Sequence, residues 1–379
     1  MTPGVALGAG TLSGTTDAGA LAACVDALLD RRTRATELFF SAEADRIARL
    51  CHRIAERFAR GGRLIAFGYS PAARSDARHV AVEFVHPVIV GKRALPALAV
   101  TREAGPLAAQ IDLLVLPDDI VIAFGGETTS DHDSDHDGAK DTRDAVTVAR
   151  RRGCLTVAFA PVGAEWELQP PSDDPFMRQE LAETLYHILW ELVHVFFDHR
   201  GLLDGAAARP VHDVGASSFL YPFLASKEHD LDAVIADVRS SVMLKANEVS
   251  ELRRLTLEGG RDVLINAARA LRASLDAGGT LIAFGNGGSA TDAMDVVADF
   301  RAAPQGWPGR RALDLTEDTA IITAIANDIG TDAIFSRQII AYARQGDFVL
   351  ALSTSGNSRN IIQALAEARA RGLTTMALV

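Results

Sequence analysis

Two short segments in the C-terminal third of the sequence have the composition of anion-binding loops. Residues 285–289 (Gly-Asn-Gly-Gly-Ser) follow an apolar run and open a stretch with helical periodicity, and residues 353–358 (Ser-Thr-Ser-Gly-Asn-Ser) do the same after the next apolar run. Glycine lets the backbone approach an anion closely, and the free N–H groups of a helix start donate hydrogen bonds to it. One such loop alone can be an ordinary turn with a serine cap. Because two of them follow neighbouring strands, the sequence predicts a phosphate site.

An acidic segment in the first half of the chain has residues spaced as in a metal-binding loop. Asp133, Asp135, Asp137, Gly138 and Asp144 match positions of a calcium-binding loop, with Asp in place of the usual final Glu. Such loops follow a helix, whereas a strand-like apolar run precedes this one. The sequence therefore favours a solvated acidic loop over a calcium site.

The elements that would position these residues occur twice along the chain. The run from Gly61 to Gly68, GGRLIAFG, recurs as GGTLIAFG from Gly278, 217 residues later. Two further matches follow in the same order: DIVIAFG from Asp119 pairs with DFVLALS from Asp347, and ARRRG pairs with ARARG. Ordered matches at nearly constant spacing indicate a duplicated domain in which loop insertions absorb the differences.

Each copy has the same order of predicted elements. A long helical stretch, 33–60 or 231–277, carries apolar residues at helical spacing and precedes a Gly-Gly pair and the short strand LIAFG. Further short apolar strands then alternate with helices. This alternation predicts an α/β fold in which each copy is a parallel sheet with helices on both faces, a flavodoxin-like arrangement of three layers. Ligands of such sheets bind beyond the carboxyl ends of the strands, where the polar loops lie.

The composition of the remaining segments suggests the domain boundaries. Residues 201–228 contain Gly, Pro and Ser breaks typical of a connection, and the first residues have the composition of a short disordered lead-in. The predicted organisation is a lead-in over 1–19, a first domain over 20–200, a linker over 201–228 and a second domain over 229–379.

The overall composition limits the partners. The chain has 379 residues, 48% of them hydrophobic, which suffices for two domains with cores of their own. A formal net charge of −11, with no run of Lys or Arg longer than the three arginines at 150–152, argues against nucleic acid as a ligand. No apolar run reaches the length of a membrane span, and no basic segment precedes an apolar one at the N-terminus, so neither a membrane partner nor secretion is expected. Three widely spaced cysteines predict a reducing, cytoplasmic environment.

Three segments resemble one known family closely. GNGGSATDAMDVVADF, TAIANDIGTDAIFSRQ and LALSTSGNSRNIIQALAEARARGL are similar to the phosphoheptose isomerase branch of the sugar isomerase (SIS) domain family. The similarity is close over about 278–379 and looser over 61–200, so it implies two SIS domains in tandem. It also implies a sugar phosphate as the ligand, with these residues binding the phosphate or lining the substrate: Asn286, Gly287, Gly288, Ser289, Asp328, Ser353, Thr354, Ser355 and Ser358.

The first copy carries residues that match the family's acid–base positions. They lie in the segments Asp76-Ala-Arg-His79-Val-Ala-Val-Glu83 and Gln179 to His187. The family's reaction moves a proton between adjacent carbons through an enediol, which needs an acid and a base beside the substrate. The resemblance implies that Glu83 and His187 exchange these protons. His79, Glu83, Gln179 and His187 are also a plausible zinc ligand set, and no organic cofactor is expected.

The two copies depart from the family in complementary ways. In the second copy, Asp295 and Asp299 stand where His and Glu are expected, and no last helix is expected before Val379. In the first copy, residues 68–73 and 125–132 replace the two phosphate loops. Active sites of the family lie between subunits and draw on both, so the resemblance predicts a composite site that the two halves of this chain share.

The expected function is therefore an aldose–ketose isomerase that converts sedoheptulose 7-phosphate to D-glycero-D-manno-heptose 7-phosphate in heptose biosynthesis. The expected assembly is a homo-oligomer, in which two chains give four SIS domains. A non-catalytic sugar-phosphate-binding regulator or scaffold is the alternative, since the fold has non-catalytic relatives. A hexosamine 6-phosphate is another possible substrate, because tandem SIS domains of amidotransferases handle such sugars, although this chain has no N-terminal glutaminase.

Overall fold

The structure, a computed structural model, describes residues 18–87, 92–101, 104–126, 133–199, 202–203, 230–303 and 306–379. It forms two compact units: an N-terminal unit, Asp30–Arg254, and a C-terminal unit made of Leu255–Val379 and the segment up to Leu29. Most of the predicted lead-in and linker lies outside the described residues. The predicted domain boundaries stay predictions, and each unit is described by itself.

The N-terminal unit contains a parallel sheet in the strand order β2-β1-β3-β4-β5. Its strands are β1 (Leu64–Gly68), β2 (Ala97–Val100), β3 (Ile120–Phe124), β4 (Leu155–Ala158) and β5 (Trp166–Glu167). Its helices are α1 (Ala18–Ala59, which begins in the other unit), α2 (Pro71–Val85), α3 (Leu107–Leu114), α4 (Asp133–Arg151) and α5 (Pro175–Asp198).

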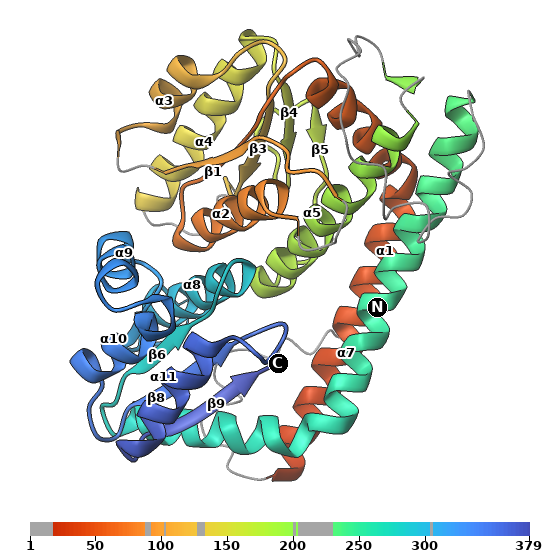
Figure 1. Cartoon of the computed structure of the whole chain (residues 1–379). Coiled ribbons are helices and arrows are strands. Elements are labelled where there is room, and N and C mark those ends of the chain that lie inside the picture. The colour runs from red at the N-terminus through yellow and green to blue at the C-terminus, as the bar shows by residue number, and fades with distance from the viewer. Residues whose placement is uncertain are drawn as a thin grey trace. The chain divides into compact units, whose positions relative to one another are not determined.

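Strand residues of this sheet alternate between two apolar cores. Leu64 and Ala66 of β1 belong to a core with α1, α2 and α5, whereas Ile65 and Phe67 belong to a core with α3 and α4. Figure 1 shows α3 and α4 on one side of the sheet and α2 on the other. Because successive strand side chains point to opposite faces, strands covered on both faces are apolar throughout. The predicted arrangement of three layers is confirmed.

The C-terminal unit repeats this plan with the strand order β7-β6-β8-β9, again all parallel. Its strands are β6 (Leu281–Phe284), β7 (Ala312–Asp314), β8 (Phe348–Leu352) and β9 (Thr374–Leu378). Its helical elements are α7 (Leu231–Asp276, which begins in the other unit), α8 (Gly288–Arg301), α9 (Thr319–Asp328), the 3₁₀ turn η4 (Thr331–Ala333), α10 (Ile334–Tyr342) and α11 (Arg359–Ala370).

The faces of the second sheet correspond to those of the first. Leu281 and Ala283 of β6 pack with α8 and the end of α7, and Ile282 and Phe284 pack with α10 and α11. The order β7-β6-β8-β9 matches β2-β1-β3-β4 strand for strand. The repeated LIAFG runs, β1 and β6, therefore occupy equivalent central positions.

The two long helices extend through both units. The predicted stretch 231–277 agrees closely with α7, whereas α1 begins well before the predicted start at 33. Its first residues, AGALAAC, include four alanines, which favour helix more than any other residue. Within the N-terminal unit, Val234 and Val238 of α7 join Phe39 and Phe40 of α1 in the core. No helix of the described residues is long and apolar enough to cross a membrane.

The acidic segment with calcium-loop spacing has a different backbone. Helix α4 begins at Asp133, so the residues expected to form a loop are helical from that point on. A calcium loop needs ligands that turn around the ion, which a helix cannot provide. The expectation of a solvated acidic loop is therefore wrong from Asp133 onward, and the calcium alternative also fails. Residues 131–132 lie outside the described residues.

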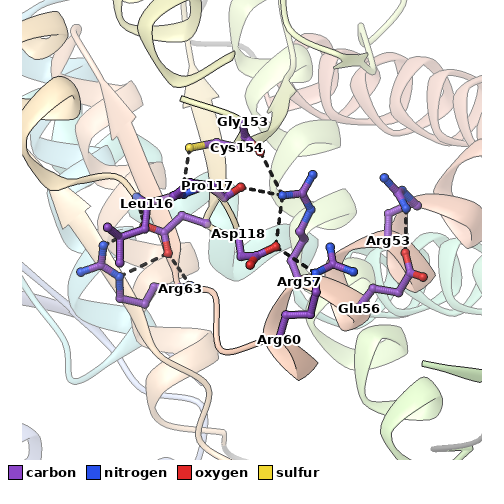
Figure 2. Close-up of polar contacts among 11 residues, drawn as sticks. Arg53, Glu56, Arg57, Arg60, Arg63, Leu116, Pro117, Asp118, Gly153 and Cys154 are labelled. Atoms are coloured by element: carbon purple, nitrogen blue, oxygen red, sulfur yellow. Dashed lines mark hydrogen bonds and ion pairs between the residues drawn. The ribbon is translucent and has the colours of Figure 1, made fainter. Parts of the chain in front are cut away.

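A buried carboxylate connects the starts of the two central strands in the first sheet. Asp119, which precedes β3, is 1% exposed. It accepts hydrogen bonds from the backbone N–H groups of Arg63 and Leu116, both at 2.8 Å, and forms an ion pair with the Arg63 guanidinium at 2.7 Å. The neighbouring Asp118 instead pairs with Arg57 and Arg60 near the surface (Figure 2).

Asp119→Asn should destabilise the protein by about 2–3 kcal/mol, because the amide leaves a buried N–H without an acceptor and removes a charge from the ion pair. Asp118→Asn is the matched control. It should cost about 1 kcal/mol or less, since exposed ion pairs contribute little. Urea denaturation followed by circular dichroism measures both variants. Equal losses would show that the buried carboxylate has no special structural role.

The three cysteines should differ in reactivity. Burial raises the pKa of the Cys154 thiol to about 11, and its S–H donates to the Leu116 carbonyl at 3.3 Å. Burial also raises the pKa of Cys51, whereas Cys24 is only half-buried. Because the thiolate is the reactive form, iodoacetamide at about pH 8 should modify Cys24 in the native protein and spare the other two until the chain is unfolded. Peptide mass spectrometry would contradict this if all three reacted at one rate.

Candidate functional site

Local sequence signals start the two helices that carry the candidate acid–base residues. Ser70 caps α2 by accepting a hydrogen bond from the Ala73 N–H at 3.1 Å. Asp174 caps α5 by accepting from the N–H groups of Phe176 and Met177. Each helix has proline as its first residue, a position where no backbone hydrogen bond is lost. The two helices pack together in the N-terminal unit.

The contact between α2 and α5 brings four polar side chains together, which we call the His/Glu cluster: His79, Glu83, Glu183 and His187. Glu83 lies between the two imidazoles, with an oxygen 3.8 Å from His79 Nε2 and the other 3.9 Å from His187 Nδ1. The two histidine rings meet edge to face with centroids 4.9 Å apart. His79 and Glu83 are buried, whereas 40% of the His187 side chain is exposed. A ligand can therefore reach the cluster from the His187 side.

Glu183 is a member of the cluster that the sequence comparison did not identify. Its Oε1 lies 3.6 Å from His79 Nδ1 and 3.8 Å from His187 Nε2. A signal was available, because Gln179, Glu183 and His187 are spaced four residues apart on one helix face. Gln179 is half-buried on this face, one turn before Glu183. The helix thus presents amide, carboxylate and imidazole in succession.

The electrostatic environment of Glu183 combines opposing effects. Burial alone would raise the pKa of its carboxyl group, but the nearby imidazoles of His187 and His79 hold that pKa below its ordinary value. The carboxylate is therefore ionised at neutral pH. Negative charge in the cluster favours a bound cation.

The donor atoms of the cluster are close enough to hold one metal ion. Those of His79, Glu83 and His187 all lie within 4.8 Å of one another. Ligands about 2.0–2.2 Å from a tetrahedral zinc ion lie roughly 3.4 Å from each other, so small side-chain rotations would close the set around zinc. Two imidazoles and a carboxylate also have the right chemistry for this ion.

The glycine-rich loop lies at the carboxyl end of β6 in the C-terminal unit. Asn286 and Gly287 are exposed, and Gly288 and Ser289 form the half-buried first turn of α8. Gly287 precedes this turn with φ +58°, which favours glycine, and no side chain caps the helix. A Cβ at Gly285 would lie 2.2 Å from the carbonyl oxygen of Ser289. The glycines therefore allow a tight turn that leaves the N–H groups of the helix start open.

The hydroxyl-rich loop follows the neighbouring strand, β8. The Ser353 hydroxyl accepts from the Gly356 N–H at 3.1 Å, and the Ser355 hydroxyl accepts from the Asn357 N–H at 3.3 Å. Thr354 is exposed in the same loop. Ser358 stands at the N-cap of α11 without a capping hydrogen bond from its side chain. These contacts shape a loop whose hydroxyls have further capacity to donate.

A pair of amide hydrogen bonds connects the two loops. Asn286 Nδ2 donates to Asn360 Oδ1 at 3.0 Å, and Asn360 Nδ2 donates back to Asn286 Oδ1 at 2.9 Å. The predicted phosphate loops thus lie side by side at the carboxyl edge of the sheet. Asn360 was not among the predicted residues. Asp328 lies at the end of α9, exposed, and accepts a hydrogen bond from the Asn327 amide at 2.7 Å.

The predicted residues therefore fall into two groups, one in each unit. The N-terminal unit holds His79, Glu83, Gln179 and His187, and the C-terminal unit holds the two loops and Asp328. The composite site, and the role of each of these residues, stay predictions.

Comparisons with known proteins place the chain in a family. The profile of the SIS domain matches residues 246–379. The phosphoheptose isomerase of Nitratidesulfovibrio vulgaris (strain Hildenborough) is 41% identical over 143 residues, which cover 38% of this chain and 69% of that protein. The phosphoheptose isomerase of Geobacter sulfurreducens is 49% identical over 116 residues, which cover 30% of this chain and 60% of that protein. The chain thus spans only part of the length of these relatives, and the similarity lies in its C-terminal part.

A solved structure supports the fold across nearly the whole chain. The tagatose-6-phosphate ketose/aldose isomerase of Escherichia coli has a TM-score of 0.50 to this chain at 14% identity, over 94% of this chain and 82% of that one. At this identity the likeness concerns the fold alone, and it agrees with two parallel sheets flanked by helices. The family follows from the sequence match alone, at 41% identity to a relative covered over 69% of its length: the chain belongs to the phosphoheptose isomerase family of SIS-domain proteins.

Proposed function

We propose that the protein is a sugar-phosphate isomerase that interconverts an aldose and a ketose through an enediol. The observation that carries this proposal is the pair of loops on β6 and β8, joined by the Asn286 and Asn360 amides. Together with membership of the family, this pair supports a phosphorylated sugar as the ligand. Substrate and reaction both belong to the proposal, because the relatives match only part of this chain.

In this proposal the two loops hold the phosphate group. The N–H groups that open α8 and α11 point their partial positive charge toward the anion. Hydroxyls of Ser353, Thr354, Ser355 and Ser358 add donors, and Asn286, Ser289 and Asp328 contact the sugar. Backbone N–H groups can bind phosphate without net positive charge, so the net charge of −11 does not conflict with this role.

The His/Glu cluster moves the protons. Glu83 removes a proton from the carbon next to the carbonyl, and His187 donates a proton to the carbonyl oxygen, which gives the enediol. Return of the first proton to the former carbonyl carbon, with loss of the hydroxyl proton from its neighbour, completes the exchange. No oxidant or reductant is needed, because hydrogen moves only within the substrate. The burial of Glu83 and the exposed face of His187 suit these roles.

Zinc is the metal that this cluster would hold. His79, Glu83, Gln179 and His187 would bind it, and a bound zinc ion would polarise the substrate carbonyl as a Lewis acid. Glu83 and His187 are assigned to both roles, so metal analysis and kinetics are needed to separate them.

The specific reaction we propose converts sedoheptulose 7-phosphate to D-glycero-D-manno-heptose 7-phosphate. We further propose that the site is composite, with loops and cluster from the two halves of one chain or from two chains of a homo-oligomer. Three free thiols among the described residues suit a cytoplasmic location.

A binding-only regulator or scaffold is the second candidate, and one observation favours it. The family profile covers residues 246–379, which include both phosphate loops but none of the His/Glu cluster. A protein that only binds a ligand needs the loops alone, so the presence of the His/Glu cluster in this chain supports the isomerase as the first candidate.

One substitution in the phosphate loops and one in the His/Glu cluster separate ligand binding from catalysis. Ser355→Ala should weaken the binding of sedoheptulose 7-phosphate by about tenfold, because a hydrogen bond to a charged group contributes about 1.5–3 kcal/mol. Glu83→Gln should leave binding nearly unchanged and lower the turnover rate by about 10²–10⁴-fold. Calorimetry measures the binding, and a coupled assay of product measures the rate.

Exposed residues serve as controls for this pair: Ser240→Ala and Glu37→Gln should change neither quantity. Isomerisation that persists in Glu83→Gln would contradict the proton-transfer role. Binding without any turnover in the unaltered protein, with or without zinc, would instead support the regulator.

Metal content tests the zinc assignment independently of activity. The purified protein, loaded with zinc and then desalted, should retain about one ion per chain, and His79→Ala should retain much less because it removes a buried ligand. Inductively coupled plasma mass spectrometry measures the bound metal. Equal retention by His79→Ala would show that zinc binds elsewhere, and it would leave the isomerase proposal untouched.

A further inference from the structure

A groove lies at the amino edge of the second sheet, at the opposite ends of the strands from the phosphate loops. Its volume is about 540 Å³, within the range of roughly 300–1,000 Å³ typical of small-molecule sites. It is lined by the Gly-Gly turn before β6, the start of β7 and the turn between α10 and β8. Four arginines line it: Arg301, Arg310, Arg311 and Arg344.

Two of these arginines are neutralised by carboxylates at the rim. Arg310 pairs with Asp276 at 2.9 Å. Arg301 pairs with Glu317 at 3.3 Å and donates to the Ala312 carbonyl. These bonds fix the directions of both guanidinium groups and leave little net charge from either pair.

The other two arginines have no carboxylate partner among the described residues. Arg311 donates only to the Gly278 carbonyl, at 3.0 Å, and the exposed side chain of Arg344 has no hydrogen bond or ion pair within the described part of the chain. Asp347 also lines the groove, but its buried carboxylate already accepts the N–H groups of Thr280 and Arg344. The four arginines thus stand against the three carboxylates of Asp276, Glu317 and Asp347, so the groove has a net charge of about +1 in a chain of net charge −11. Two of its guanidinium groups have no carboxylate partner among the described residues.

We propose that this groove binds a small phosphate ester or diphosphate, at a second anion site distinct from the phosphate loops. Guanidinium groups match phosphate oxygens in geometry and charge, and Arg311 and Arg344 have N–H donors available for such a contact. Tyr342, 42% exposed, and Gln345 line the same groove and can contact an organic part of the ligand. The modest volume favours a small molecule over a nucleic acid or an acidic protein.

The strand geometry keeps this groove separate from the phosphate loops. Both sites involve β8, but the loop follows Leu352 and the groove precedes Phe348. Five residues of strand span roughly 17 Å at about 3.3 Å per residue. One sugar phosphate cannot fill both sites, so the groove would bind a second molecule.

Titration with inorganic pyrophosphate, followed by calorimetry without divalent cations, tests the proposal on the whole chain. The double variant Arg311→Ala/Arg344→Ala should raise the dissociation constant about tenfold or more. Arg337→Ala is the matched control: Arg337 is exposed in the same unit and does not line the groove, so its loss should change nothing. Ser355→Ala should keep pyrophosphate binding at the groove.

Three outcomes would overturn the proposal: no binding to the unaltered chain, equal binding by the double variant, or loss of binding only in Ser355→Ala, which would place pyrophosphate in the phosphate loops. Far-UV circular dichroism checks that the double variant folds. Arg344→Ala alone, whose side chain makes no bond within the described residues, replaces the double variant if that one is unstable, and it should weaken binding in the same direction.

Discussion

The arrangement of each sheet depends on one buried carboxylate at the start of its central strands. Asp119 accepts the N–H groups of residues 63 and 116, and Asp347 accepts those of residues 280 and 344. An unpaired N–H or carboxylate at these positions would cost several times the net worth of a hydrogen bond. The central strands are therefore held in one register, and the turns that follow their carboxyl ends lie at the same edge of the sheet. The glycine before β1 is also required at this edge, since a Cβ at Gly62 would lie 2.1 Å from the carbonyl oxygen of Asp118.

On this common scaffold, local turn chemistry decides which copy can bind an anion. In the first copy, the Ser70 hydroxyl accepts the Ala73 N–H and so caps α2 internally. In the second copy, Gly287 leaves the start of α8 without a side-chain cap, and Asn286 bonds across to the other loop. A capped helix start has fewer donors to offer a ligand. The same fold thus carries a polar cluster on the helices of one copy and open loops on the strand ends of the other.

The sequence allowed prediction of those features that local pattern determines. Buried parallel strands are apolar runs, so the repeated LIAFG segments were recognisable as central strands. The start of helix α4 at Asp133 was not recognisable, because the spacing of acidic residues does not determine the backbone conformation. Glu183 and Asn360 were missed for another reason. Each acquires its place only when two elements distant in sequence pack together, α2 against α5 or β6 beside β8. The spacing within α5 places Glu183 on the face of Gln179 and His187, but its contact with His79 of α2, like the contact between Asn286 and Asn360, is tertiary and has no signal within a single segment.

The amino edges of the two sheets provide a comparison that bears on the arginine groove. In the first sheet this edge also carries arginines, and Figure 2 shows them engaged: Arg57 with the carbonyls of Pro117 and Gly153, and Arg60 with Asp118. Arg63 is likewise paired with Asp119. In the first sheet, these arginines connect the end of α1 to the turns that precede β3 and β4. In the second sheet, Arg311 and Arg344 occupy the same edge without a carboxylate partner among the described residues, and the buried Asp347 carboxylate accepts backbone N–H groups instead. Packing alone accounts for the first set, whereas the two guanidinium groups of the second set have no carboxylate partner among the described residues, and the proposed anionic ligand would bind to them.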